Sequence, residues 1–417
     1  MNPVYLVPGL RTPFCKVDGP LGSLDAIQLS IPVAQAMAKV AKPDVMVWGT
    51  VIPSLRWSNL AREVLLDAKL DPNIPAISTV QACATSMVGV FEAAGILTKN
   101  RSLALVGGVE AMSQVQIGLT QGFSNWLRAL MQARSLGQRI DVLTSVKFKD
   151  LRLDIPSVKN RVTGKSMGEH CEEMAKQWKI PREAQDRIAF ESHQRAVKAM
   201  AGGFFDDLIY AVNGTAKDGI PRADSTLEKL ATLRPAFDRQ NGTITAGNAS
   251  PLTDGAAAIW VASEDGLKKL PSNAPRVKLL DYEMSGVDIF TEGLLMAPAY
   301  AIPRLLARNA MTLSSIDLWE IHEAFAAQVL CNVAAIENES FVREKAGVSA
   351  TLGKFSWDRL NPNGGSVAIG HPFGATGARI LSQAAKELHA MGPGKRAIVS
   401  ICADGGLGAV ALLESVA

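Results

Sequence analysis

Short apolar runs of strand length alternate with longer amphipathic stretches along most of the chain. The helical patterns include Ala84–Leu97 and Gly374–Leu388. Strands that alternate with helices favour an α/β protein with mostly parallel sheets, covered by helices on both faces. The predicted strands are Val45–Trp48, Ala76–Val80, Leu103–Val106, Val277–Leu280, Asp317–Ile321 and Ile398–Ile401.

The strand–helix–strand pattern occurs twice. Near Cys83, a strand-like run leads into a helix and then into Leu103–Val106. Near His371, the run Ser366–Ile369, which we interpret as a strand, leads into a helix and then into Ile398–Ile401. We therefore expect two similar halves that face each other, each with reactive groups where a strand ends and a helix begins.

A different kind of segment separates the two halves. From about Leu119 to Gly242 the alternation stops, and Met167–Trp178 and Arg182–Ala201 have the pattern of amphipathic helices. The sequence predicts an inserted, mainly helical loop domain at 119–242. The N-terminal half is then 1–118, completed by about 243–270, and the C-terminal half is 271–417.

The stretch from Trp126 to Arg152, inside the predicted insertion, is rich in basic side chains. An ordinary solvated helical face would account for it. The alternative is a docking surface for a partner or for an anionic membrane. The charged residues are Arg128, Arg134, Arg139, Lys147, Lys149 and Arg152 against Asp141 and Asp150.

Composition limits the possible classes of protein. The 417 residues are 47% hydrophobic and 20% charged, which predicts more than one domain and a large core. A net charge of +3 gives no general argument for nucleic-acid binding. Scattered cysteines indicate reduced thiols and a cytoplasmic location rather than a disulfide framework. We expect no signal peptide and no membrane span.

Two cysteines and two histidines stand in turn-like settings of small residues, and they are the candidates for chemistry. Cys83 precedes a predicted helix, whose N-terminus would favour the thiolate. Cys402 follows an apolar strand and precedes a Gly-Gly turn. His371 stands between Gly and Pro where the backbone leaves helical geometry, and His322 follows a predicted strand. A core histidine remains an alternative for His322.

The other cysteines and histidines give weaker signals. Cys15, Cys331 and His389 have the settings of core or surface residues. His170 and Cys171 are adjacent on a predicted helix, where neighbouring side chains diverge by about 100° and cannot share a metal. With no zinc-type spacing, we expect no metal.

Several motifs together resemble the thiolase family over essentially the full length of the chain. The sequence around His322, His-Glu-Ala-Phe, has His where most thiolases have Asn. This form is similar to the β-subunit of the fatty-acid oxidation trifunctional complex and its bacterial counterparts. The motifs are the Cys83, His371 and Cys402 segments, Gly107–Ser113, Thr245–Ser250, Asp254–Ala257, Leu233–Asp238 and Met167-Gly168.

The resemblance implies a thiolase fold of two βαβαβ-type halves and cleavage of a 3-ketoacyl-CoA by CoA in fatty-acid β-oxidation. Cys83 would be the nucleophile, His371 its base and Cys402 the second acid and base. His322 and His371 would hold one oxyanion, and the backbone N–H groups of Cys83 and Asp404 the other. Asp404 stands where relatives often have Gly or Ala, and its carboxylate would raise the pKa of Cys402 if buried.

The resemblance also implies CoA as a substrate, with no permanently bound cofactor. Met167, Phe237 and Ser250 match positions that contact CoA. We expect a homodimer or tetramer, an association with a hydratase/dehydrogenase subunit and a peripheral membrane contact. The alternatives are a biosynthetic acetoacetyl-CoA thiolase, a ketosynthase-like condensing enzyme, and a CoA-binding scaffold without catalysis.

Overall fold

The computed structural model describes residues 3–147, 151–156 and 158–416. They form two compact units: a larger one from the residues up to Gln114 and from Asn160 onward, and a smaller one at Val115–Lys159. The predicted division at 1–118, 119–242 and 271–417 stays a prediction. None of the described helices combines the length and the apolar character needed to cross a membrane.

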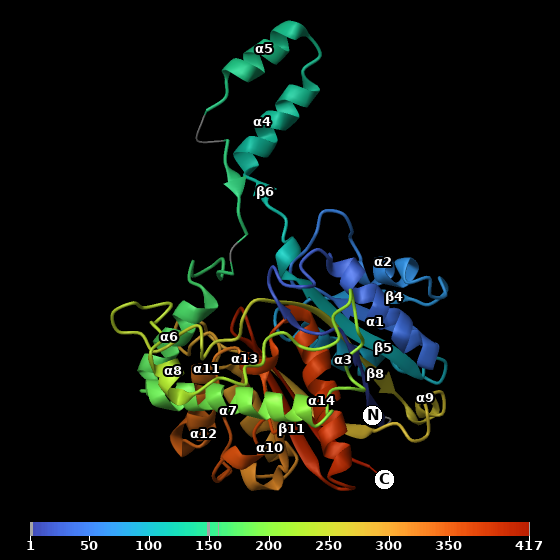
Figure 1. Cartoon of the computed structure of the whole chain (residues 1–417), viewed down its shortest axis with the longest axis vertical. Helices are drawn as coiled ribbons and strands as arrows, with labels where there is room; N and C mark the ends of the chain where they lie inside the picture. Colours follow the sequence, from blue (N-terminus) through green and yellow to red (C-terminus); the bar gives the residue numbers. More distant parts are fainter. Residues whose placement is uncertain (1–2, 148–150, 157, 417) are drawn as a thin grey trace. The chain divides into compact units, whose positions relative to one another are not determined.

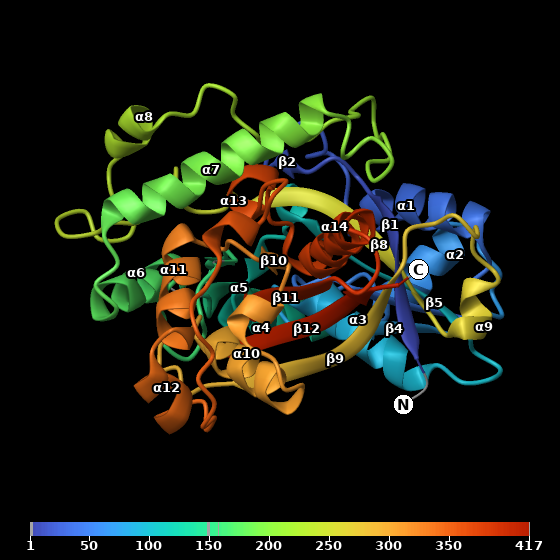
Figure 2. The same ribbon diagram turned by 90° about the horizontal axis from the view of Figure 1, so that it is seen from below.

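One mixed sheet organises the larger unit, and its described strands run in the order β10-β11-β12-β9-β1-β8-β5-β3-β4, with β2 paired to β8. Figure 2 shows β11, β12 and β9 side by side with α10 packed against them. The strands are β1 (Val4–Arg11), β2 (Cys15–Lys16), β3 (Val45–Gly49), β4 (Ala76–Thr79), β5 (Leu103–Ala111), β8 (Thr253–Ala262), β9 (Val277–Gly286), β10 (Leu318–Ile321), β11 (Arg396–Ala403) and β12 (Leu407–Ser415).

The prediction of mostly parallel strands is wrong. Among the described strands of this sheet, β3 pairs in parallel with β4 and β5, and β10 with β11, but the other six pairings are antiparallel. The pair β11–β12 shows one cause, because Gly405 and Gly406 have φ of 86° and 75° and reverse the chain in a tight turn. An apolar run predicts a buried strand but carries no information about its direction.

The run Ser366–Ile369 is also not the strand that we expected. It forms the short helix α13, which begins after Gly365 and ends at Gly370, whose φ is 110°. A four-residue apolar run fits a buried helix turn as well as a strand. Here the positive φ of Gly370 ends the helix and turns the chain toward His371.

Helices cover both faces of this sheet (Figure 1). The helices of the larger unit are α1 (Ala26–Val40), α2 (Leu60–Asp67), α3 (Thr85–Ile96), α6 (Met167–Gln177), α7 (Arg182–Ala201), α8 (Leu227–Ala231), α9 (Glu264–Leu267), α10 (Ala297–Arg308), α11 (Ala326–Ile336), α12 (Glu339–Glu344), α13 (Ser366–Ile369) and α14 (Thr376–Ala390). Short 3-10 turns lie at Met112–Gln114, Leu313–Ser315, Trp357–Arg359 and Phe373–Ala375.

Alternate residues of the central strands enter different cores. In β5, Ala104 and Val106 pack into a core that contains residues of α3 and α14, whereas Leu103 and Leu105 pack into a core with residues of α1. A strand buried on both faces needs apolar residues at every position, which is why β5 is a continuous apolar run.

Helices α3 and α14 lie against each other in the middle of the larger unit (Figures 1 and 2). They approach so closely at Gly377 that a Cβ atom there would collide with the backbone N of Met87. The Ser86 hydroxyl also accepts a hydrogen bond from the backbone N–H of Ala378, at 2.8 Å. The close packing and the hydrogen bond therefore fix the position of the start of α3 relative to the start of α14.

The smaller unit contains the two-stranded pair β6 (Gly118–Leu119) and β7 (Leu153–Asp154), with helices α4 (Gln121–Gln132) and α5 (Leu136–Thr144). Neither helix has a fully buried residue. Trp126 connects them, because its indole N–H donates to the carbonyl of Val142 at 2.9 Å. Lys149 and Asp150, part of the predicted basic stretch, lie outside the described residues.

Candidate active site

Cys83 lies in a tight turn between β4 and α3. The residue before it, Ala82, has a φ of 45°, which is uncommon for a residue with a Cβ. Thr85 stabilises the turn, because its hydroxyl donates to the carbonyl of Ala82 at 2.7 Å and accepts from the N–H of Gln81 at 2.8 Å. The turn presents a half-buried Cys83 at the start of a buried helix.

Two histidines lie beside this thiol. Cys83, His322 and His371 each offer an Sγ or ring nitrogen atom, and these three atoms all lie within 4.8 Å of one another. The imidazole centroids are 4.1 Å apart with the rings inclined at 51°. His322 follows β10, and His371 follows α13, so the fold brings together residues that are nearly 300 positions apart in sequence. Both histidines are buried.

The ring of His371 is held from behind by Thr376. Its Nδ1 lies 2.6 Å from Thr376 Oγ1, and that hydroxyl is 3.4 Å from the carbonyl of Pro372, to which it donates. If Nδ1–H donates to Thr376, the hydroxyl proton can turn to the carbonyl of Pro372, and Nε2 carries the lone pair. Burial lowers the pKa of His371 to about 3. The ring is therefore a neutral imidazole with a basic Nε2.

His322 is held in the same way by a different hydroxyl. Its Nδ1 lies 2.8 Å from Ser366 Oγ. Burial lowers the pKa of His322 well below its usual value, and the nearby His371 and Arg379 add to the effect. The Nε2 atoms of His322 and His371 are buried and have no hydrogen-bond partner among the described residues. Two unsatisfied ring nitrogens next to a thiol indicate a site for a polar ligand.

Cys402 supplies a second thiol at the end of β11, opposite Gly408 of β12. It is buried, and burial raises its pKa well above the usual value, with a further contribution from the nearby Cys83. All five cysteines of the chain are described and none forms a disulfide, so both thiols of the site are free.

The pKa of Cys83 differs from our expectation. The position before a helix favours a thiolate, but burial raises this pKa to about 12, and the carboxylate of Asp404 adds to the increase. Hydrogen bonds from the backbone N–H groups of Asp404 and Cys83 oppose the shift without cancelling it. Desolvation therefore outweighs the helix N-terminus. In the free protein Cys83 is a thiol, and it needs a base to react.

The condition for the expected effect of Asp404 on Cys402 is not met, because the Asp404 carboxylate is only half-buried, and its charge raises the pKa of Cys83 instead. This carboxylate is held by two hydrogen bonds, one from a distant segment and one from its own loop. Its Oδ1 accepts from Asn160 Nδ2 at 2.8 Å and from the N–H of Gly405 at 2.6 Å. With the carboxylate held there, the backbone N–H of Asp404 points toward Cys83.

The three residues predicted to contact CoA lie around the segment that follows His322. Phe237 is 37% exposed and makes an edge-to-face contact with Phe325 at 6.0 Å between ring centroids. The Ser250 hydroxyl donates to the carbonyl of Ala324 at 2.9 Å. Met167 packs on the hydrophobic core that contains Phe325 and Cys402. Their contact with CoA stays a prediction.

Sequence reasoning missed the residues that orient the site. Glu110 belongs to the Gly107–Ser113 motif, and its buried carboxyl is the hub of several hydrogen bonds. It accepts from the N–H of Gly374, near His371. It also accepts from the Thr50 hydroxyl and from the N–H groups of Val51 and Ile52. Burial raises its pKa to about 7. An acidic residue inside the apolar run of β5 was the available signal. Ser366, Thr376 and Arg379 gave no comparable signal.

The donor atoms of Cys83, His322 and His371 are also of the kinds that zinc prefers. The spacing alone does not distinguish a metal site from a pair of imidazoles that act on a thiol. The absence of a metal stays a prediction.

A free thiol beside two buried neutral imidazoles, at helix starts of an α/β fold, is an arrangement for thiol chemistry. The sequence matches the family descriptions "Thiolase, N-terminal domain" over residues 4–265 and "Thiolase, C-terminal domain" over residues 273–415. The chain therefore belongs to the thiolase family, whose members are acyltransferases.

Individual relatives agree with this assignment. A 3-ketoacyl-CoA thiolase of Yersinia enterocolitica is 38% identical over 423 residues, which cover 99% of this chain and 96% of the relative. The structure of the Bacillus anthracis acetyl-CoA acetyltransferase superposes with a TM-score of 0.80 at 30% identity, covering 100% of this chain and 99% of that one. The structure of human mitochondrial 3-ketoacyl-CoA thiolase in complex with CoA superposes with a TM-score of 0.79 at 29% identity, covering 100% of this chain and 98% of that one. The predicted thiolase fold is confirmed.

Proposed function

We propose that the protein is a 3-ketoacyl-CoA thiolase of fatty-acid β-oxidation, which cleaves its substrate with CoA to acetyl-CoA and a shortened acyl-CoA. The observation that carries the proposal is the cluster of the Cys83 thiol with two neutral imidazoles, next to a second thiol at Cys402. The 3-ketoacyl-CoA thiolases among its relatives support the choice of substrate.

In the first half of the reaction, His371 Nε2 takes the proton of Cys83, and the thiolate attacks C3 of the substrate. The C2–C3 bond then breaks, its electron pair goes to C2, and Cys402 protonates the acetyl-CoA enolate. The products are acetyl-CoA and an acyl-cysteine. A covalent intermediate divides one difficult step into two easier ones.

In the second half, the Cys402 thiolate takes the proton of an incoming CoA thiol. The CoA thiolate attacks the acyl-cysteine, acyl-CoA leaves, and the imidazolium of His371 returns its proton to Cys83. Each thiol and the imidazole then have their original protons, so the enzyme is ready for another cycle.

Two sets of donors are available for the two oxyanions. His322 and the protonated His371 would hold the thioester oxygen of the acetyl unit. The backbone N–H groups of Cys83 and Asp404 would hold the oxygen on C3, and both already point to the Cys83 sulfur. Donors that are fixed before the reaction lower the barrier without reorganisation.

The test is thiolysis of a series of 3-ketoacyl-CoA substrates, followed by the loss of thioester-enolate absorbance. A higher kcat/KM for chains longer than acetoacetyl-CoA supports the proposal. Activity on acetoacetyl-CoA alone would favour the biosynthetic thiolase, the second candidate, which the likeness to an acetyl-CoA acetyltransferase supports. Reaction only with carrier-protein thioesters would indicate a condensing enzyme, and no reaction at all a scaffold.

Met167, Phe237 and Ser250 are proposed to contact the pantetheine arm of CoA, because they surround the segment that follows His322. Replacing Phe237 with Ala should raise KM for CoA several-fold with little change in kcat. A fall in kcat alone would place Phe237 outside the CoA site.

The proposed assembly is a cytoplasmic homodimer or tetramer that associates with a hydratase/dehydrogenase subunit or with a membrane surface. The support is the stretch from Trp126 to Arg152, where Met131 is 85% and Leu136 75% exposed among arginines. Apolar side chains flanked by basic ones suit an acidic partner or anionic lipid. Changing Arg128, Arg134 and Arg139 to Glu should weaken co-purification or vesicle binding and leave thiolysis unchanged. Unchanged association would identify an ordinary solvated face.

A further inference from the structure

A buried chain of hydrogen bonds extends from His322 away from Cys83. Ser366 Oγ lies 2.8 Å from His322 Nδ1 and accepts a hydrogen bond from Arg379 Nη2 at 2.7 Å. His322 and Ser366 have no exposed surface, and Arg379 is 3% exposed. The chain thus connects a permanent donor, the guanidinium, through one hydroxyl to an imidazole.

The direction of each hydrogen bond in this chain is fixed by chemistry. A guanidinium has no acceptor, so Ser366 Oγ must accept from Arg379. The Ser366 hydroxyl has one proton of its own, and His322 Nδ1 is its only acceptor among the described residues. If Nδ1 carried a proton, the Ser366 proton would be buried without a partner, which is unfavourable. The arrangement therefore places the proton of His322 on Nε2.

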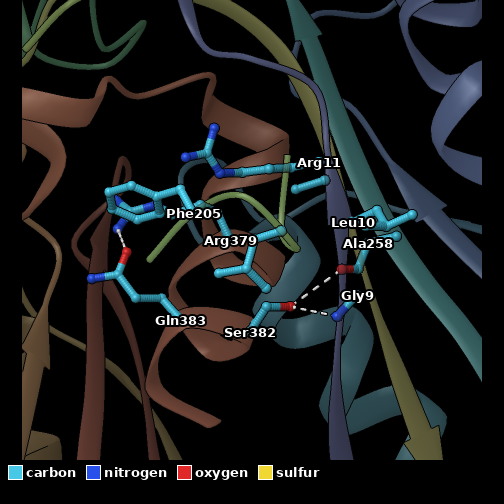
Figure 3. A pocket seen from close by; sticks show the side chains of 10 residues that line it. Gly9, Leu10, Arg11, Phe205, Ala258, Arg379, Ser382 and Gln383 are labelled. Carbon is cyan, nitrogen blue, oxygen red and sulfur yellow. Dashed lines mark hydrogen bonds between the residues drawn. The ribbon is translucent and has the colours of Figure 1, made fainter. Parts of the chain in front are cut away.

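Arg379 is itself held in place by a buried polar cluster. Figure 3 shows it beside Arg11, Phe205 and Gln383, with a hydrogen bond from its Nη1 to Gln383 Oε1 at 3.3 Å. Gln383 in turn donates to Glu387 Oε1 at 3.2 Å and to the carbonyl of Gly364 at 3.2 Å. Burial lowers the pKa of Arg379 to about 10, so it remains a cation at neutral pH. The donor to Ser366 is therefore constant through the working pH range.

The hydroxyls beside the two histidines have opposite hydrogen-bonding roles. Thr376 has a carbonyl, that of Pro372, to which its own proton can turn, so it can accept from Nδ1 of His371, which leaves Nε2 of His371 as an acceptor. Ser366 accepts from Arg379 and donates to His322, which leaves Nε2 of His322 as a donor. Two neighbouring imidazoles of the same tautomer could not serve as base and oxyanion donor at the same time.

We propose that Ser366 and Arg379 are positioning residues that hold His322 in the Nε2–H tautomer, so that it donates to the oxyanion while His371 acts as base. The proposal deepens the proposed function and rests on it for the identity of the oxyanion. It assigns a task to Ser366, a residue in the short helix that the sequence pattern suggested was a strand.

The first test determines by NMR which ring nitrogen of His322 is protonated, and it does not depend on enzyme activity. In protein labelled with 15N in histidine, only five imidazoles contribute, and the His322→Asn variant identifies the signals of His322. Long-range 1H–15N correlations should show His322 with a protonated Nε2 and His371 with a protonated Nδ1. A protonated Nδ1 on His322 would overturn the proposal, whatever the enzyme catalyses.

The second test is a double-mutant cycle measured on the preferred 3-ketoacyl-CoA. An asparagine at position 322 offers an amide donor that needs no partner at Ser366. Ser366→Ala should therefore lower kcat on the order of 10-fold or more in the His322 enzyme, with little change in KM, and less than about twofold in the His322→Asn background. Equal losses in both backgrounds would mean that Ser366 only stabilises the fold.

Ser400 provides a matched control for the cycle. It is also a buried serine next to His322, whose backbone N–H donates to the Ser400 carbonyl at 2.8 Å. Its hydroxyl has no hydrogen-bond partner among the described residues. Ser400→Ala should leave kcat unchanged in both backgrounds, and a loss like that of Ser366→Ala would overturn the specific role of Ser366. If no 3-ketoacyl-CoA is cleaved, the proposed function is wrong. The NMR measurement still shows whether Ser366 and Arg379 hold His322 in the Nε2–H tautomer.

Discussion

The turn before α3 and the turn before α14 place a reactive residue in closely similar ways. In each, a residue with positive φ, Ala82 at 45° or Gly370 at 110°, immediately precedes the reactive one. The difference lies in exposure and charge. Cys83 is half-buried and its pKa is raised, whereas His371 is buried and its pKa is lowered.

The comparison shows that the Cys83 thiol and the His371 imidazole are both neutral in the free protein near neutral pH. The fold makes a thiolate costly at one turn and an imidazolium costly at the other, and it places the two within one cluster. In the proposed mechanism, charge develops only when the proton moves from the Cys83 sulfur to the His371 nitrogen during the attack. We interpret the neutral pair as a way to keep Cys83 unreactive until a substrate is bound.

Replacing Cys83 with Ser should have the largest effect and tests the first turn directly. A hydroxyl is a far weaker nucleophile than a thiol near neutral pH, so thiolysis should fall to almost nothing. Mass spectrometry should also show no acyl group on the protein after incubation with substrate. Acylation at the wild-type level would place the nucleophile elsewhere and remove the basis of the comparison.

Cys402 belongs to neither turn, so its replacement should separate the two halves of the reaction. Cys402→Ala should lower thiolysis about 10²–10⁴-fold, the usual effect of removing one acid/base group. Transfer of an acyl group from acyl-CoA to Cys83 should persist, because the Cys83–His371 pair is intact. Near-normal thiolysis would show that another group protonates the enolate.

His322→Ala should have a smaller effect, because His371 keeps its hydrogen bond to Thr376 and can still act as the base. Loss of one oxyanion donor should lower kcat on the order of 10²-fold with a smaller change in KM. His322→Asn should recover part of the loss. If His322→Ala unfolds the protein and the folded fraction has normal kinetics, His322 is a core histidine.

The raised pKa of Cys83 predicts a particular pH dependence for its alkylation. Because a thiol pKa of about 12 lies above the usual value, iodoacetamide labelling should keep rising above pH 9 instead of levelling off near neutrality. Asp404→Asn removes a negative charge that disfavours the thiolate. Labelling of that variant at pH 8 should be a few-fold faster, and an unchanged rate would show that burial alone raises the pKa.

The sequence predicted that four candidate residues stand at turns, and the structure brings three of them, Cys83, His322 and His371, into one cluster, while their catalytic roles stay predictions. Cys83, His322, His371 and Cys402 lie at the ends of elements that the apolar pattern located, such as β10 and β11. Strand direction was not predictable, because a buried strand looks the same in either orientation. Arg379 has the pattern of an exposed helix arginine, and only the packing of α14 shows that it is buried. Contacts across the fold cannot be read from local periodicity.

The contact of Gly377 with Met87 limits how the site can change. The packing of α3 against α14 helps to set the distance between Cys83 and His371, because these two residues lie in the turns just before the two helices. A side chain at Gly377 would collide with the backbone of Met87, so the starts of α3 and α14 would have to move apart. A substitution meant to change which acyl chain is bound, without altering the distance between Cys83 and His371, should therefore be made away from the contact of α3 with α14.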